Sequence, residues 1–297
     1  MTAPMSEPAT GPVIVGVDGG PAGRDALQLG RWAAETLQAP LIVAVVHPAP
    51  TAISPGRVDA EWVADRHRAA QAVLDDVRGT LEGAGCTVEY RTVASSSAAH
   101  GLHDLAEAEH AQLIVVGSGK QAPQYRLFAG STADRLLSGS MCPVAVAPAG
   151  MEVPAGGLGR IGVAYVDTPD GRAAVEKAGD LARRTGTPLR LYTVVADRDA
   201  SLPWLVGQDS EHAFQDIARE IYEQALQKAA DSAGAVESDW QVLTGDVVET
   251  LAELDDIDVL FCGSRGYGPG RRVLLGGVSA RLVRRARRPV VVVPRSG

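Results

Sequence analysis

Glycines at fixed intervals follow two strand-like apolar runs of the chain. In the later run, "DVLFC" leads into Gly263, Gly266 follows after two residues, and Gly276 and Gly277 come after nine more. Glycine has no side chain to block a ligand and tolerates a positive φ, and a following helix would offer unpaired N–H groups and a positive dipole end. The pattern therefore predicts a phosphate-binding loop, or else a tight turn without a ligand.

The same arrangement occurs earlier in the chain, with changes. "LIVV" leads into Gly117, and Lys120 stands where the second glycine is expected. After nine residues, Gly130 is followed by Ser131 and Thr132. The lysine would act as a point charge on a phosphate, and the two hydroxyls would cap the helix and donate to the ligand. The alternative is a solvated Lys120 in a loop that cannot close over a nucleotide, because lysine lacks glycine's freedom at positive φ.

An internal repeat relates the two loops. Residues 13–46 align with 161–195 at an offset of 148, and the carboxyl-terminal parts of the two copies align at an offset of 146. Landmarks in this order indicate a duplicated domain. We expect a first domain over 1–150, a glycine- and proline-rich linker over 151–159, and a second domain over 160–297.

Each copy alternates short, apolar, β-branched runs with segments of alanine, leucine and charge at helical spacing. Such runs are typical of strands buried on both faces of a parallel sheet. Their alternation with helices predicts an α/β fold of two tandem, doubly wound, five-stranded parallel sheets. Ligands in such sheets bind beyond the carboxyl ends of the strands, where both glycine loops lie. The expected strands are 13–18, 41–47, 86–93, 112–117 and 143–148, then 160–166, 188–196, 236–243, 257–263 and 289–294.

The aspartate that ends strand one and the G-x2-G-x9-G-[S/T] spacing after strand four resemble the universal stress protein family. The resemblance covers both halves, as in the tandem-domain members of actinobacteria. It implies Rossmann-like domains of the adenine nucleotide α-hydrolase type and a nucleotide-binding regulator of the stress response. In ATP-binding members the strand-one aspartate lies near the adenosine, and the glycine loop holds ribose and phosphates. The resemblance thus implies ATP, ADP or AMP as the ligand, together with Mg²⁺.

The resemblance marks nucleotide-binding positions in both halves. In the second half, Val166 stands at the position of the strand-one acid, with Asp167 one step on. Gly277 replaces the Ser or Thr, and Ser279 offers the next hydroxyl. One missing hydrogen bond costs about 1 kcal/mol, whereas a loop that cannot approach a phosphate loses several contacts, so the second half is favoured unless Lys120 compensates. The marked positions are Asp18, Gly19, Gly117, Lys120, Gly130, Ser131 and Thr132, then Asp167, Gly263, Arg265, Gly266, Gly276, Gly277, Val278 and Ser279.

Binding without a dedicated catalytic centre is the favoured interpretation. N-type ATP pyrophosphatases carry S-G-G-x-D-S at the first loop, and "VDGGPAGRD" lacks the leading serine. No H-I-G-H, G-x-S-x-G or Ser-His-Asp order points to another enzyme. A phospho-acceptor receiver domain needs clustered acids, but a single acid, Asp18, ends strand one. Two alternatives stay open: a ligand-free interaction module with degenerate sites, and an adenylating or slowly ATP-hydrolysing enzyme.

Composition argues against several classes of protein. The net charge of −8 disfavours general affinity for nucleic acid or anionic membranes, and the arginines of 271–288 are interpreted as a solvated helix face. No apolar run is long enough to span a bilayer, and "MTAPMSEPATGP" is no secretory signal. Cys86, Cys142 and Cys262 are expected to be reduced thiols, and the histidines of 100–110 lack the ligands of a metal site. These features predict a cytoplasmic protein without a metal centre.

The last strand of each copy, in "PVAVAP" and "RPVVVVP", is short and apolar. In the family that the chain resembles, the last strands of two domains pair across a pseudo-twofold axis. A tandem chain can make that pairing internally and cover both edges. We therefore expect an internal pseudo-dimer. A homodimer through the last strands and a regulatory protein partner are further expectations.

Overall fold

Strands and helices alternate along the chain in the order that the sequence predicts. The computed structural model describes residues 11–49, 60–153, 157–195, 208–234, 237–264 and 277–294. The strands are β1 (Val13–Gly16), β2 (Leu41–Pro48), β3 (Val88–Ser95), β4 (Leu113–Gly117), β5 (Val144–Ala147), β6 (Ile161–Ala164), β7 (Leu189–Val195), β8 (Ser238–Thr244), β9 (Val259–Gly263) and β10 (Val290–Val293). The helices are α1 (Pro21–Leu37), α2 (Ala60–Thr80), α3 (Ala98–Ala108), α4 (Ser131–Leu137), α5 (Pro169–Thr185), α6 (Gln208–Ser232), α7 (Val247–Ala252) and α8 (Gly277–Leu282).

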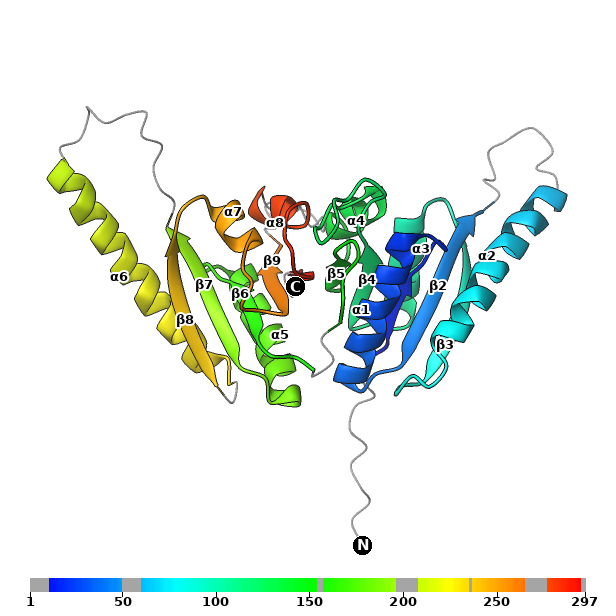
Figure 1. Ribbon diagram of the computed structural model, residues 1–297, viewed down its shortest axis with the longest axis horizontal. Helices are drawn as coiled ribbons and strands as arrows, with labels where there is room; N and C mark the ends of the chain where they lie inside the picture. The colour runs from blue at the N-terminus through cyan, green and yellow to red at the C-terminus, as the bar shows by residue number, and fades with distance from the viewer. Residues whose placement is uncertain are drawn as a thin grey trace, which may run out of the picture.

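One ten-stranded sheet runs through both halves of the chain, in the order β3-β2-β1-β4-β5-β10-β9-β6-β7-β8 (Figure 1). Neighbouring strands within each half are parallel, as the sequence predicts. β5 and β10 are antiparallel, with Val144 opposite Val292 and Val146 opposite Val290. This confirms the predicted internal pairing of the last strands. Because β4 and β9 occupy their other edges, a homodimer through the last strands would have to displace pairing within the chain.

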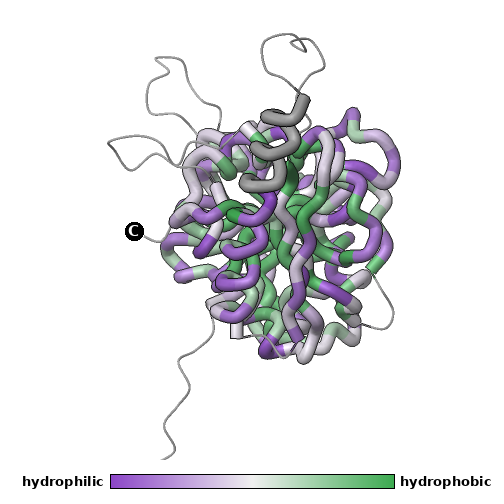
Figure 2. The backbone as a smooth tube through the Cα atoms, turned by 90° about the vertical axis from the view of Figure 1, so that its left-hand side faces the viewer, coloured by the Kyte–Doolittle hydropathy of each residue, from purple (hydrophilic) through white to green (hydrophobic). Residues whose placement is uncertain are grey.

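Successive strand residues point to opposite faces of the sheet, and each face has its own apolar core. Val13 and Val15 of β1 belong to the core under α1, α2, α5 and α6. Ile14 belongs to the core under α3, α4, α7 and α8. Both cores contain residues from both halves, and Figure 2 shows green hydrophobic segments inside purple hydrophilic ones. The two halves are therefore one folded body with continuous cores.

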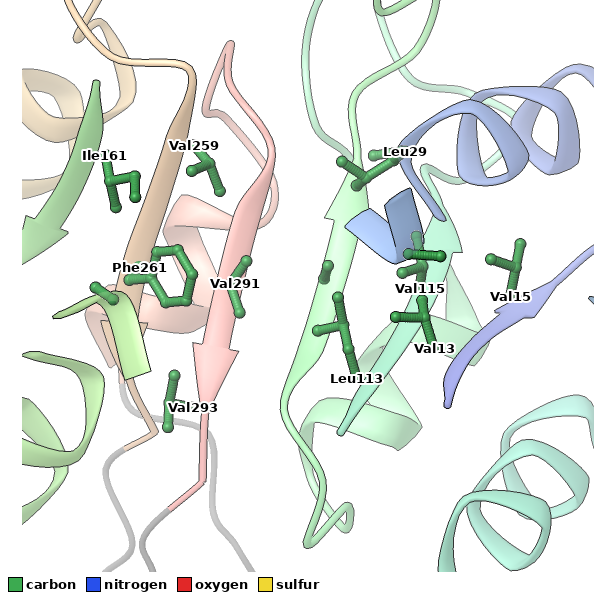
Figure 3. Close-up of a cluster of buried hydrophobic side chains, with 14 of the residues drawn as sticks. Val13, Val15, Leu29, Leu113, Val115, Ile161, Val259, Phe261, Val291 and Val293 are labelled. Carbon is green, nitrogen blue, oxygen red and sulfur yellow. The ribbon is translucent and has the colours of Figure 1, made fainter. Parts of the chain in front are cut away.

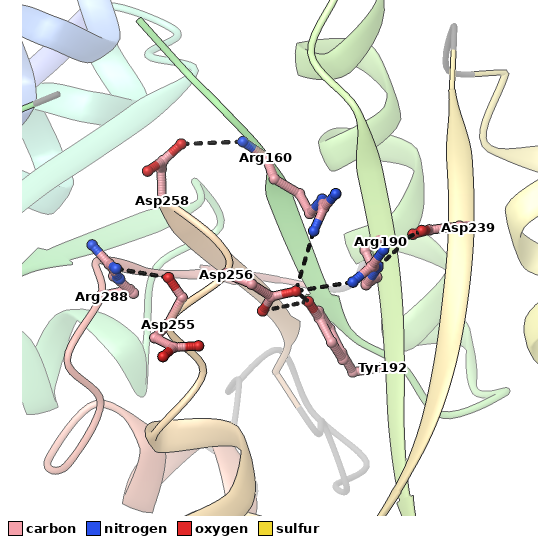
Figure 4. Close-up of polar contacts among 8 residues, drawn as sticks. All are labelled: Arg160, Arg190, Tyr192, Asp239, Asp255, Asp256, Asp258 and Arg288. Carbon is pink, nitrogen blue, oxygen red and sulfur yellow. Dashed lines mark hydrogen bonds and ion pairs between the residues drawn. The ribbon is translucent and has the colours of Figure 1, made fainter. Parts of the chain in front are cut away.

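A polar network lies at the amino-terminal ends of the strands of the second half (Figure 4). The Asp256 carboxylate accepts from the Tyr192 hydroxyl at 2.9 Å and from Arg190 at 3.0 Å. Arg160 donates to the same carboxylate at 3.3 Å, and Arg190 Nε donates to Asp239 at 2.7 Å. Burial, followed by the Asp256 bond, raises the pKa of Tyr192. The network therefore ties the residues just before β6 and β9 to the first residues of β7 and β8.

Among the described helices, none combines the length and the apolar character that a membrane span requires.

Candidate functional site

An open cavity of about 520 Å³ lies beyond the carboxyl ends of β1, β2 and β4. Doubly wound sheets bind their ligands in this position. The start of α1, the start of α3, the start of α4 and one face of α2 complete its walls. The cavity gathers most of the first-half positions that the sequence marks, namely Asp18, Gly117, Lys120, Gly130, Ser131 and Thr132. Gly19 lies beside them with a φ of 77° and faces Val73 of α2.

The loop after β4 is held by internal hydrogen bonds although Lys120 replaces the expected glycine. Gly119 N donates to Phe128 O at 2.6 Å. The Ser118 hydroxyl donates to Ala147 O at 2.8 Å and accepts from Phe128 N at 3.3 Å. Lys120 is not among the described non-glycine residues with a positive φ. The chain path therefore does not require glycine at position 120, so the part of the objection that rests on a positive φ does not apply.

The second half of the chain supports this loop. Leu127 N donates to Ala286 O at 2.8 Å, and Ala129 N donates to Val283 O at 2.9 Å. The Leu127 side chain is fully buried. The loop that lines the first-half cavity is therefore positioned by backbone atoms just beyond the end of α8.

Two glycines of the motif have structural reasons to be glycine. A Cβ on Gly117 would overlap the carbonyl oxygen of Ala22 at the start of α1. A Cβ on Gly130 would come within 3.2 Å of the Gly119 Cα. Close packing between backbones therefore explains part of the pattern without a ligand. A substitution such as Gly130→Val would disturb the loop itself, so it is a poor probe of ligand contact.

The Asp18 side chain is exposed, and a local turn fixes its orientation. Its Oδ1 accepts from Gly20 N at 2.9 Å. Its other carboxylate oxygen, Oδ2, has no hydrogen-bond partner among the described residues. Oδ2 can therefore accept a hydrogen bond from a ligand. The side chain thus combines a fixed orientation with spare acceptor capacity at the rim of the cavity.

Sequence reasoning missed the wall formed by β2 and α2. Val45, Ala70 and Val73 make it apolar, and Arg66 and His47 add polar groups. Only 8% of His47 is exposed, and its Nε2 lies 3.4 Å from Nδ1 of His67, which is also on α2. His47 ends a predicted strand, which is the one signal that would have placed it at the ligand edge. The cavity therefore has an apolar side and a polar side.

The strand-one acid of the second half is engaged elsewhere. Asp167 forms an ion pair with Arg172 and accepts from the Tyr165 hydroxyl at 3.2 Å. It lines a separate groove between α5 and α6. Burial, and then the Asp167 carboxylate, raise the pKa of Tyr165 to about 12. Asp167 therefore does not take the place that Asp18 has in the first half.

Two more side chains distinguish the second half. The Ser279 hydroxyl is buried and donates to Gly263 O at 2.7 Å, so it is not directed at a ligand. Asp170 stands where the repeat has Ala22, and its Cβ would lie 2.8 Å from a Cβ on Gly263. Asp170 is 8% exposed, and its Oδ1 has no hydrogen-bond partner among the described residues. A buried acidic side chain against Gly263 disfavours a phosphate at this strand end.

The other second-half positions give less information. Gly277 and Val278 form the first turn of α8. Arg265, Gly266 and Gly276 lie outside the described residues, so the predicted loop geometry of the second half stays a prediction.

The arginines at the end of the chain mostly form ion pairs with carboxylates. Arg284 binds Asp134 of α4 at 2.7 Å. Arg287 binds Glu253 at 2.7 Å, and Glu253 also binds Arg126 of the first half at 2.7 Å. Two of these pairs join the halves. Their geometry agrees with the interpretation of 271–288 as a solvated, paired face for the part that is described.

The cysteines are free, as expected. Burial raises the pKa of Cys142 and of Cys262 to about 12, so both remain thiols at neutral pH. In the part of the chain that the structure describes, no three His, Cys, Asp or Glu side chains come together as a metal site.

Comparison with known proteins gives consistent matches. The sequence model described as "Universal stress protein family" matches residues 10–148 and 157–294. A universal stress protein of Mycobacterium tuberculosis (strain ATCC 25618 / H37Rv) is 31% identical over 295 residues, which cover 95% of this chain and 99% of that protein. A universal stress protein of Mycobacterium bovis shows the same identity and coverage.

Solved structures agree on the fold. The crystal structure of a universal stress protein from Archaeoglobus fulgidus superposes with a TM-score of 0.68. The match covers 96% of this chain and 98% of that one, at 19% sequence identity. At that identity the likeness shows the fold alone.

Proposed function

Because this chain belongs to the universal stress protein family, we propose that it is a stress-response regulator whose first half binds an adenine nucleotide. The observation that carries the proposal is the convergence of Asp18, Lys120 and Ser131 on one cavity at the carboxyl edge of the sheet. Its volume of about 520 Å³ lies within the range typical of small-ligand sites, roughly 300 to 1,000 Å³.

The two sides of the cavity match the two ends of a nucleotide. Val45, Ala70 and Val73 offer apolar surface to a base. Lys120 and Ser131 are exposed beside the start of α4 and offer a charge and a hydroxyl to phosphates. The carboxylate of Asp18 would accept hydrogen bonds from ribose hydroxyls.

Mg²⁺ fits this site only through the nucleotide. Magnesium is usually held by one or two carboxylates together with phosphates and water. Asp134, the acid in the first turn of α4, is paired with Arg284. Ser131 and Thr132 offer only hydroxyl oxygens. The phosphates and water would therefore supply most of the ligands of the ion.

The choice of the first half reverses the preference drawn from the sequence. Lys120 does not adopt a positive φ, so the lysine does not prevent the backbone of the first loop from approaching a phosphate. In the second half, Asp167 is paired with Arg172, and Asp170 is buried beside Gly263. These contacts favour binding of a phosphate in the first half.

The chain offers a matched pair of variants to test this choice. Asp18→Asn keeps an oxygen that accepts from Gly20 but removes the charge, and Asp167→Asn makes the same change at the related position of the second half. We expect calorimetry with ATP, ADP and AMP, each with magnesium, to give one site per chain. Affinity should fall about tenfold in Asp18→Asn, as for loss of a charge-assisted hydrogen bond, and stay unchanged in Asp167→Asn.

Each other outcome has a definite meaning. Loss of affinity in Asp167→Asn alone would move the site to the second half. No binding of any nucleotide at millimolar concentration would refute the proposal and favour the ligand-free interaction module. Rapid hydrolysis of ATP over many turnovers would favour the enzyme alternative.

A further inference from the structure

A second cavity lies at the junction of the two halves, on the face of the sheet that α1 and α5 cover. Its volume is about 130 Å³, and none of its lining residues belongs to the cavity of the proposed nucleotide site. Figure 3 shows side chains from both halves in this region, with Leu29 and Leu113 on one side and Phe261 and Val291 on the other. The apolar lining residues are Leu29, Trp32, Ala33, Leu37, Leu113, Leu158, Leu181, Phe261 and Val291, together with Ala145, Val259 and Pro143. We call this cavity the junction cleft.

The size of the junction cleft indicates the size of the group that it accepts. An engineered apolar cavity of about 150 Å³ lined by similar side chains stays dry and binds benzene. The junction cleft is comparable in volume and is lined by an indole, a phenyl ring and aliphatic groups. A single aromatic ring, or a compact branched alkyl group of similar volume, therefore fits.

The rim of the junction cleft is cationic on one side only. Lys177, Leu181 and Arg184 follow one another at i, i+4 and i+7 on α5 and so share a face. Lys177 and Arg184 are exposed, and within the described residues neither forms an ion pair. Arg184 donates a long hydrogen bond of 3.5 Å to Leu37 O at the end of α1. The acid on this face, Asp180, is already paired with Arg183.

The opposite wall carries no charge. α1 contributes Leu29, Trp32, Ala33, Thr36 and Leu37 to the lining. The cleft thus combines an apolar interior with two cations at one edge that have no acidic partner among the described residues. That arrangement is complementary to a small amphiphile whose head is an anion.

We propose that the junction cleft binds a small carboxylic acid that carries one aromatic ring or a compact branched alkyl group. The apolar group fills the interior, and the carboxylate lies at the rim formed by Lys177 and Arg184. Because both halves line the cleft, the bound acid bridges them and stabilises their pairing. This site is independent of the nucleotide site and does not rest on the function proposed above.

Phenylacetate is a suitable probe, and phenylacetamide is its neutral counterpart. Both are titrated into the full chain, with saturation-transfer NMR as the readout. The change in tryptophan fluorescence that is lost in a Trp32→Phe chain serves as a second readout, because the chain has four tryptophans. We expect phenylacetate to bind three- to fivefold more tightly than phenylacetamide at low salt, as is typical for exposed charge pairs, and we expect high salt to remove the difference. Saturating ATP should leave phenylacetate binding unchanged.

Variants of the lining separate the interior from the rim. Ala33→Leu fills the interior and should abolish binding of both probes. Lys177→Met should weaken phenylacetate about threefold and leave phenylacetamide unchanged. Lys228→Met, on α6 away from the cleft, is the matched control and should bind both probes like the parent chain.

Three results would overturn the proposal: equal affinity for the two probes at low salt, unchanged binding in a folded Ala33→Leu chain, or no binding of phenylacetate at tens of millimolar. If Ala33→Leu does not fold, Lys177→Met and Arg184→Met decide the question. Both side chains are exposed, so replacing them leaves the core intact. Parent affinity for phenylacetate in both of these variants would refute the cationic rim.

Discussion

Lys120 offers the sharpest test of the first-half site, because it occupies the place of a family glycine. Two substitutions separate its charge from its backbone. Lys120→Met removes the ammonium and keeps a long side chain, whereas Lys120→Gly also restores the residue that the family pattern expects. If the loop suffered from the missing glycine, Lys120→Gly would bind more tightly than the parent. If the charge matters, both variants would bind more weakly.

The structure gives the size of the expected effect. Lys120 is exposed, and no ion pair is recorded for it within the described residues. Solvent therefore screens its attraction for a phosphate to about 1 kcal/mol, near the upper end of measured exposed pairs. A loss of about 1 kcal/mol corresponds to a roughly fivefold increase in Kd for ATP. AMP carries less charge, so its Kd should increase about twofold.

The assay is titration calorimetry with ATP and AMP at low and high salt. We expect Lys120→Met and Lys120→Gly to bind ATP equally weakly, and we expect the difference from the parent to shrink at high salt. Lys228→Met, on α6, is the control for a lost surface charge. Tighter binding of ATP by Lys120→Gly would refute the reasoning, since it would mean that the backbone at position 120 does require glycine. Parent affinity for ATP in both variants would remove Lys120 from the site.

Four further predictions concern stability and assembly. Gly117→Ala should lower the free energy of unfolding in urea by at least about 2 kcal/mol, because the new methyl overlaps Ala22 O; an unchanged midpoint would contradict this packing. Tyr192→Phe should cost about 1 kcal/mol in the same assay, since Asp256 keeps its two arginine partners, and a loss above about 3 kcal/mol would contradict that compensation. Burial raises the pKa of Cys262 from 9.0 to about 12, so the folded state holds this proton more tightly than the unfolded state. The free energy of unfolding should therefore fall as the pH rises above 9. Cys262→Ala should flatten that slope between pH 9 and 11, and an unchanged slope would count against this role of Cys262. The halves expressed separately should dimerise or aggregate in sedimentation, because β5 or β10 then presents a bare edge; well-behaved monomers would show that the pairing is dispensable.

The amino-acid sequence by itself determined the duplication, the alternation of strands and helices, and the edge of the sheet at which a ligand would bind. These features depend on local periodicity and on the direction of parallel strands, which a single chain displays in its residue order. The pairing of β5 with β10 was implied by the family resemblance, in which the last strands of two domains pair, and a tandem chain covers both edges by pairing internally.

Only the tertiary structure decided how the two sites differ. Asp167 forms an ion pair with Arg172, and Asp170 is buried against Gly263. Neither contact can be inferred from spacing, because each depends on how a helix start packs on a strand end. The first loop likewise takes its shape from bonds of Leu127 and Ala129 to the other half. Contacts between segments far apart in the chain thus favour the first cavity, and the same juxtaposition of α1 and α5 creates the junction cleft.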